Sequence, residues 1–75
     1  MCEMRVTYDA EVDAAYISLK TIAAGEARHQ VPVSHEVAAG EIILDLDRDG
    51  TLIGIEVLNA RSGLPKEVLD EAERL

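Results

Sequence analysis

The sequence predicts a single α+β domain: a small antiparallel sheet of four to five strands with a C-terminal helix that packs on one face of the sheet or on a second subunit. A length of 75 residues suits one domain, 1–75. Short segments rich in β-branched residues alternate with turn residues through about residues 4–60, which is typical of hairpins. Over about residues 65–74 the apolar residues recur at steps of three and four, which is typical of a helix.

Residues 5–8 and 14–19 are predicted to form the first two strands, because both segments contain β-branched and aromatic residues. The polar segment 9–13 between them is of turn type, so we expect a hairpin. Residues 27–33 alternate between apolar and polar and predict a third strand. Pro32 cannot donate to a ladder, which indicates either an edge position or an early end of this strand. Residues 34–40 are expected to be a loop.

Residues 41–47 and 51–58 predict a second hairpin around a tight turn at 48–50, where Gly50 suits a left-handed backbone. Both faces of segment 51–58 carry apolar residues, so we expect it to be central or to lie in a subunit interface. Gly54 in mid-strand indicates a bulge or a close approach of another backbone segment. In the final helix, Pro65 suits the first turn, and Arg74 lies where the helix dipole favours a cation.

The composition limits what the protein does. Seven Lys and Arg against 15 Asp and Glu give a formal charge of −8, and the basic residues are scattered along the sequence. Nucleic-acid binding needs clustered basic residues, so we expect no nucleic-acid partner. An acidic surface instead suits a basic protein partner, or solubility alone. Since Phe and Trp are absent, the core must be aliphatic and small, and we expect a homodimer.

The expected location is the cytoplasm. No apolar run approaches the roughly 18 residues that span a bilayer, and the N-terminal residues lack a basic-then-apolar signal pattern. One cysteine, Cys2, cannot form an internal disulfide, which agrees with a reducing compartment. We expect no membrane partner and no cofactor.

One segment matches the twelve-residue calcium-loop pattern D-x-[DN]-x-[DN]-G-x5-E. In such a loop the metal ligands include Asp45, Asp47, Asp49 and Glu56. The flanking segments are strand-like rather than helical, and the ninth position, normally polar, is Ile53. A hairpin with a solvated acidic turn is therefore the preferred interpretation, and calcium binding is the alternative.

Other residues offer no convincing catalytic set, so the prediction leans against an enzyme. The acidic residues at 9, 11 and 13 suit a solvated turn, since catalytic carboxylates need burial or a charge partner. The serines lack a nucleophile-elbow motif. Tyr8 and Tyr16 are expected to be neighbours across the first hairpin.

Two motifs resemble a family of small prokaryotic proteins catalogued as domain of unknown function number 2283. Residues 8–17 read Y-D-x-x-x-D-A-x-Y-I, and residues 49–60 read D-G-x-x-x-G-I-E-x-L-x-A. The chain departs from the family pattern in its longer stretch from 26 to 40. The resemblance implies a mainly antiparallel β fold and transfers no activity. Some members are encoded beside small toxin-like proteins, so the resemblance also suggests an antitoxin-like role.

The leading hypothesis is therefore a non-catalytic protein-interaction module. The alternative is a small-ligand binder or enzyme that uses a cluster formed by Tyr8, Asp9, Asp13, Tyr16 and Glu56.

Overall fold

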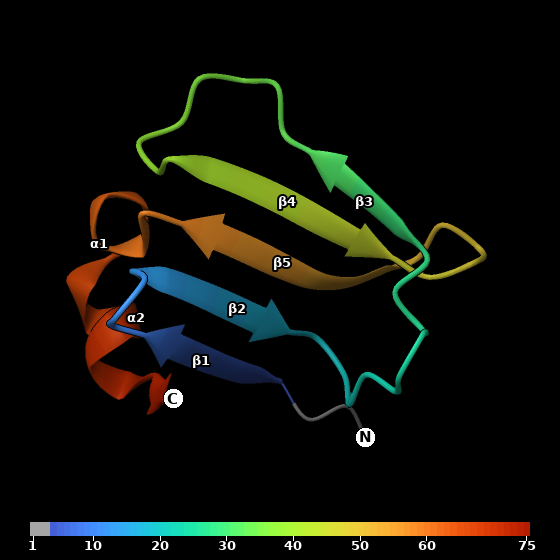
Figure 1. Ribbon diagram of the computed structural model, residues 1–75, viewed down its shortest axis with the longest axis horizontal. Coiled ribbons are helices and arrows are strands. Elements are labelled where there is room, and N and C mark those ends of the chain that lie inside the picture. Colours follow the sequence, from blue (N-terminus) through green and yellow to red (C-terminus); the bar gives the residue numbers. More distant parts are fainter. Residues whose placement is uncertain (1–3) are drawn as a thin grey trace.

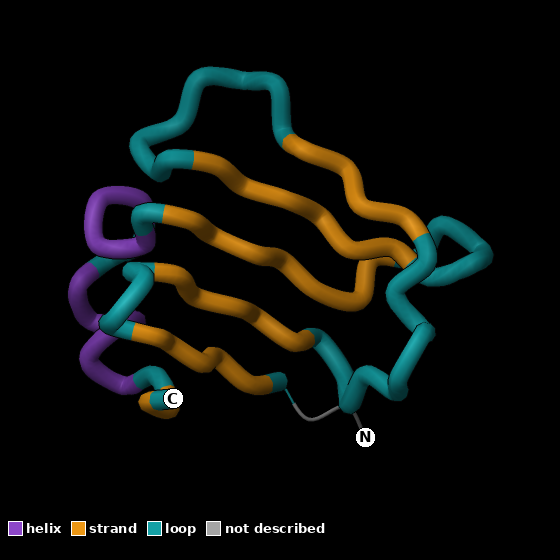
Figure 2. The backbone as a smooth tube through the Cα atoms, viewed as in Figure 1, coloured by secondary structure: helices purple, strands orange, loops and turns teal. Residues whose placement is uncertain are grey.

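The computed structural model describes residues 4–75, so Cys2 lies outside the described residues. Within this range six strands and two short helices form one α+β unit, which confirms the predicted fold class (Figures 1 and 2). The elements are β1 (Arg5–Asp9), β2 (Ala14–Ser18), β3 (His29–Pro32), β4 (Glu41–Leu46), β5 (Leu52–Leu58), α1 (Ala60–Gly63), α2 (Lys66–Glu71) and β6 (Glu73–Arg74).

The strands form one sheet in the order β3-β4-β5-β2-β1-β6. Neighbouring strands are antiparallel except for β1 and β6, which pair in parallel. Strand β3 lies at an edge, as predicted, but it covers His29–Pro32 rather than the predicted 27–33. Strand β5 is flanked on both sides. Residues 34–40 form no helix or strand, also as predicted.

The prediction of four to five strands is wrong, because residues 4–75 contain six. The predicted helix over about 65–74 ends at Glu71, and the chain then becomes extended at Ala72. Glu73 and Arg74 pair with β1, where Arg5 and Glu73 form an ion pair at 2.7 Å. The apolar periodicity continues to Leu75 and therefore predicted a longer helix. It contains no information about the free edge of β1, with which Glu73 and Arg74 pair.

The core lies on one face of the sheet, where cross-strand pairs align apolar residues in rows. The buried row consists of Tyr8, Ala15 and Val57, with Ile42 packed beside it. Leu69 of α2 and Ala60 of α1 complete this core, so both helices cover one end of the same face. The next row, here called the apolar row, crosses five strands and consists of Val6, Ile17, Ile55, Leu44 and Val31.

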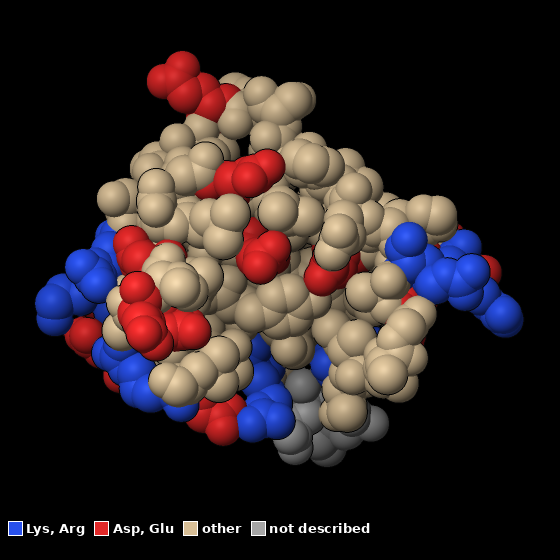
Figure 3. Space-filling model, viewed as in Figure 1, with Lys and Arg blue, Asp and Glu red and all other residues tan. Residues whose placement is uncertain are grey.

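The opposite face of the sheet, here called the acidic face, carries Glu41, Asp45 and Glu56 on its central strands together with Tyr16, Ile43 and Leu58. Figure 3 views this face and shows acidic side chains in its middle, over β4 and β5. The β-strand period of two places these residues opposite the core residues.

The β4–β5 hairpin turns at residues 47–50, with Gly50 at a φ of 84°. The pairing register shifts between Asp45, which pairs with Gly54, and Leu46, which pairs with Leu52, so Ile53 of β5 is the extra residue of a β-bulge. This bulge lies beside the glycine for which the sequence predicted an irregularity. Among residues 4–75, no helix has the length and apolar character needed to cross a bilayer.

Candidate functional site

A hydrogen-bonded network joins Tyr8 of β1, Asp13 of the β1–β2 turn and Arg61 of α1. The Tyr8 hydroxyl donates to Asp13 Oδ1 at 2.7 Å and accepts from Arg61 Nε at 3.1 Å. The backbone N–H of Arg61 also donates to Asp13 Oδ1 at 3.0 Å. One tyrosine and one carboxylate therefore tie β1 and its adjoining turn to α1, which lies 48 residues beyond Asp13 in the sequence.

The local backbone explains why Asp13 reaches α1. Asp13 has a φ of 55°, a left-handed conformation that aspartate tolerates better than most residues. Its carbonyl oxygen accepts the backbone N–H of Ala60 at 3.0 Å. Asp13 therefore satisfies two backbone donors at the start of α1, one with its carbonyl oxygen and one with its side chain, and fixes where that helix begins.

The charges in this network support one another. The pKa of Asp13 is lowered, chiefly by the Tyr8 hydrogen bond; burial opposes this, and the Arg61 N–H and the Arg61 charge each lower the pKa by a smaller amount. The pKa of Arg61 is raised, mainly by Tyr8 and also by the Asp13 charge. Asp13 is therefore ionised and Arg61 is cationic at neutral pH.

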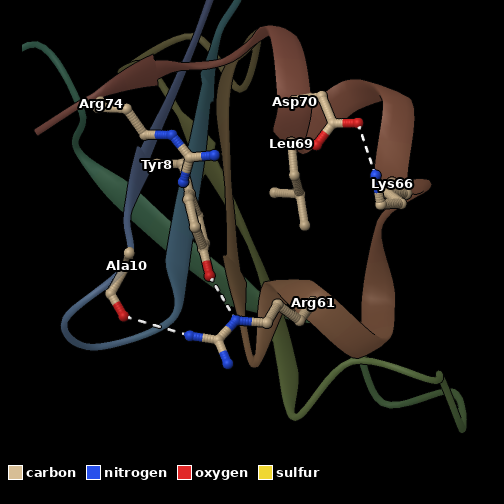
Figure 4. A pocket seen from close by; sticks show the side chains of 7 residues that line it. All are labelled: Tyr8, Ala10, Arg61, Lys66, Leu69, Asp70 and Arg74. Carbon is tan, nitrogen blue, oxygen red and sulfur yellow. Dashed lines mark hydrogen bonds and ion pairs between the residues drawn. The ribbon is translucent and has the colours of Figure 1, made fainter.

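A pocket of about 500 Å³ opens beside this network, between β1 and the helices (Figure 4). The Tyr8 ring forms its buried wall, and the Arg74 guanidinium lies over that ring at 5.0 Å from the centroid. Leu69 points into the pocket from α2. The complete lining is Tyr8, Ala10, Arg61, Lys66, Leu69, Asp70 and Arg74.

A second polar cluster lies on the acidic face. The Tyr16 hydroxyl donates to Asp45 Oδ2 at 2.6 Å, and the Asp45 side chain is buried. The other carboxylate oxygen, Oδ1, has no hydrogen-bond partner within residues 4–75. A Cβ at Gly54 would collide with the Tyr16 hydroxyl, so the glycine is required for this contact. Burial, then the Asp45 hydrogen bond, raises the pKa of Tyr16 well above its usual range.

The structure divides the predicted cluster between the two faces of the sheet. Tyr8 and Asp13 lie together at the helical end, whereas Tyr16 and Glu56 are cross-strand neighbours on the acidic face. Asp9 joins neither group, because its carboxylate accepts the Glu11 N–H at 3.0 Å in a local turn. The five residues therefore do not converge in one pocket.

The segment that matches the calcium-loop pattern has the hydrogen bonds of a β-hairpin. Asp47 Oδ1 accepts the backbone N–H groups of Asp49 and Thr51, both at 2.9 Å. The Asp45 carboxylate is held under Tyr16, and Glu56 lies farther along β5. In the described part of the chain, no three His, Cys, Asp or Glu side chains are grouped to hold a metal ion.

The pocket residues Arg61, Lys66 and Arg74 were not predicted from the sequence, in which the basic residues are scattered. In the structure these three line one pocket, and Figure 3 shows Lys and Arg side chains gathered at the end where the helices lie. The available signal was the position of Arg61 directly after the second motif. No sequence pattern reveals the proximity of Arg74, because it depends on the pairing of β6 with β1.

A comparison with protein families matches residues 5–61 to the family described as Protein of unknown function (DUF2283). The chain belongs to this family. Comparisons with curated proteins and with solved structures gave no match. The matched range contains the whole Tyr8–Asp13–Arg61 network and the Tyr16–Asp45 pair of the DUF2283 domain. The other wall of the pocket comes from the segment after the match.

Proposed function

We propose that this DUF2283 domain is a non-catalytic interaction module that binds a basic protein partner through its acidic face. The observation that carries the proposal is the uncompensated charge in the middle of that face. None of the ion pairs within residues 4–75 includes Glu41, Asp45 or Glu56. An antitoxin-like role would be one instance of such binding.

The character of the surface around these carboxylates supports the proposal. Tyr16, Ile43 and Leu58 are half-buried on the acidic face and give it apolar area beside the charges. Interfaces commonly combine a tyrosine or aliphatic centre with charges that steer and orient the partner. A formal charge of −8 would accelerate the approach of a cationic protein.

The test is capture of interacting proteins from the native host, followed by affinity measurement with each purified candidate. We expect a basic protein whose affinity falls about tenfold or more in Glu56→Lys, since close interfacial charge pairs couple by 1.5 kcal/mol or more. Glu36→Lys is the matched control, because it changes the net charge equally from an exposed loop position. Recovery of no basic partner, or equal weakening by both variants, would contradict the proposal.

We further propose that two copies associate through the apolar row. A compact monomer of 8.1 kDa exposes about 4500 Å², whereas this chain exposes 5285 Å². The apolar row offers area for a contact, because Val31 is 42% exposed and its other four members are only half-buried. The acidic faces of two copies repel each other, so the row on the opposite side is the better contact.

Sedimentation equilibrium tests this association. Val31 stands in the apolar row and is 42% exposed, so Val31→Glu should fold and still place a charge in the interface. We expect a dimer whose dissociation constant rises about tenfold or more in this variant. Val12→Glu is the control, because Val12 is 65% exposed in the β1–β2 turn. A monomeric wild type, or equal effects of both substitutions, would refute the dimer.

A further inference from the structure

The pocket beside Tyr8 has the opposite charge to the rest of the protein. Three cations, Arg61, Lys66 and Arg74, line it against a single carboxylate, Asp70, which gives the lining a formal charge of +2. Two of these cations already have carboxylate partners, because Lys66 pairs with Asp70 at 3.1 Å and Arg61 Nε lies 3.8 Å from Asp13 Oδ1. Arg74 is the cation of the lining without a carboxylate partner among residues 4–75. In a chain with a net charge of −8, this concentration of positive charge favours an anionic ligand.

Both arginines have N–H donors available for such a ligand. The Arg74 guanidinium lies on the Tyr8 ring and has no hydrogen-bond partner among residues 4–75, so the contact with the ring leaves its N–H groups free. Arg61 uses Nε for the Tyr8 hydroxyl and makes one long contact of 3.5 Å from Nη2 to the Ala10 carbonyl. A guanidinium has five donors, so Arg61 keeps several for a ligand.

The same contacts hold these side chains in position before a ligand arrives. Tyr8 is 3% exposed, and its hydroxyl is fixed between Asp13 and Arg61. Arg61 is therefore oriented by a buried partner, and Arg74 by the ring that the same tyrosine supplies. Preorganised donors lose less conformational entropy on binding than freely rotating ones.

The size and the walls of the pocket indicate the kind of anion. A volume of about 500 Å³ lies in the range of small-molecule sites and exceeds what a bare phosphate fills. Leu69 and the Tyr8 ring provide apolar wall next to the cations. We propose that this pocket binds a small organic oxyanion, a phosphate monoester or a carboxylate, whose charged group lies between Arg61 and Arg74. This inference is independent of the proposed partner and dimer.

Titration of the ¹⁵N-labelled protein with phenyl phosphate, benzoate and inorganic phosphate tests the proposal. We expect saturable shifts of the Arg61 amide with at least one of the two organic anions, at a dissociation constant of about 1 mM or below. Inorganic phosphate should bind more weakly, because it leaves the apolar wall empty. The tighter organic probe identifies the source of the oxyanion.

Two pairs of variants complete the test. Arg74→Gln should weaken binding about tenfold, whereas Arg48→Gln, which removes the same charge at the distant hairpin turn, should change it less than about twofold. Ala10→Glu should abolish binding by adding a carboxylate to the lining, with Ala24→Glu in an exposed loop as its control. Absence of saturation up to about 10 mM, or equal effects within each pair, would overturn the proposal.

Discussion

Replacing Tyr16 by Phe tests the buried hydrogen bond beneath the acidic face. The substitution removes one hydroxyl and keeps the ring that covers Gly54. Asp45 then loses the 2.6 Å bond to its Oδ2, and its Oδ1 already has no partner. The result is a carboxylate that is 7% exposed and has no hydrogen-bond donor among residues 4–75.

The expected cost follows from the burial of this carboxylate. A hydrogen bond to a charged group contributes about 1.5–3 kcal/mol, and a buried group left without a partner moves the cost to the upper end. We therefore expect the free energy of unfolding to fall by about 3 kcal/mol in Tyr16→Phe. The free energy of unfolding of a 75-residue domain is about 4–11 kcal/mol in total. A loss of about 3 kcal/mol corresponds to a fall in Tm of about 12–24 °C.

Urea denaturation at pH 7 measures this loss, with Asp45→Asn and the double variant completing a thermodynamic cycle. A neutral amide is easier to bury than a carboxylate, so the double variant should be more stable than Tyr16→Phe alone. The reasoning is refuted if Tyr16→Phe costs less than about 0.5 kcal/mol, the range of ordinary surface substitutions. It also fails if Asp45→Asn does not relieve the effect of Tyr16→Phe.

Three further predictions concern the same two networks. Gly54→Ala should lower the free energy of unfolding by about 3 kcal/mol in urea denaturation, because its Cβ displaces the Tyr16 hydroxyl and breaks the bond that Tyr16→Phe also removes. It should cost far less in a Tyr16→Ala background. The raised pKa of Tyr16 means that its stabilisation is complete below its unfolded value near 10 and is lost at higher pH, so urea midpoints above pH 10 should fall more steeply in wild type than in Tyr16→Phe. The lowered pKa of Asp13 gives the opposite sign: its stabilisation is present above about pH 4 and is lost as the pH falls. The urea midpoint of Asp13→Asn should therefore depend less on pH between about pH 4 and 2 than the wild-type midpoint does.

The strands could be predicted because period-two patterning is local. The alternation in residues 41–46 and 52–58, interrupted by an acidic turn with a glycine, is sufficient to place the β4–β5 hairpin. The C-terminal segment could not be predicted in the same way. An apolar stripe at helical spacing describes Leu69 correctly, but Glu73 and Arg74 follow the edge of β1, which lies nearly a whole chain length away in sequence.

The candidate site was only partly predictable for a related reason. Motif residues can be found from sequence, but their grouping depends on which face of the sheet each one takes. In the β1–β2 hairpin Tyr8 pairs with Ala15, and Tyr16 pairs with Thr7. Paired residues share a face and successive residues alternate between faces, so Tyr8 and Tyr16 point to opposite faces of the sheet. A cluster that looked continuous in the motif therefore becomes two separate networks.

This separation allows three binding surfaces to coexist in a small domain. The acidic face around Glu56, the apolar row ending at Val31 and the pocket under Arg74 lie on different parts of the sheet and its helical end. The charge of −8 is the sum over regions of opposite sign. Net charge alone therefore does not describe any of the three surfaces. Loss of partner binding in Glu56→Lys should therefore leave both dimer formation and binding of organic anions unchanged. Simultaneous loss of all three would indicate unfolding of the sheet rather than damage to one surface.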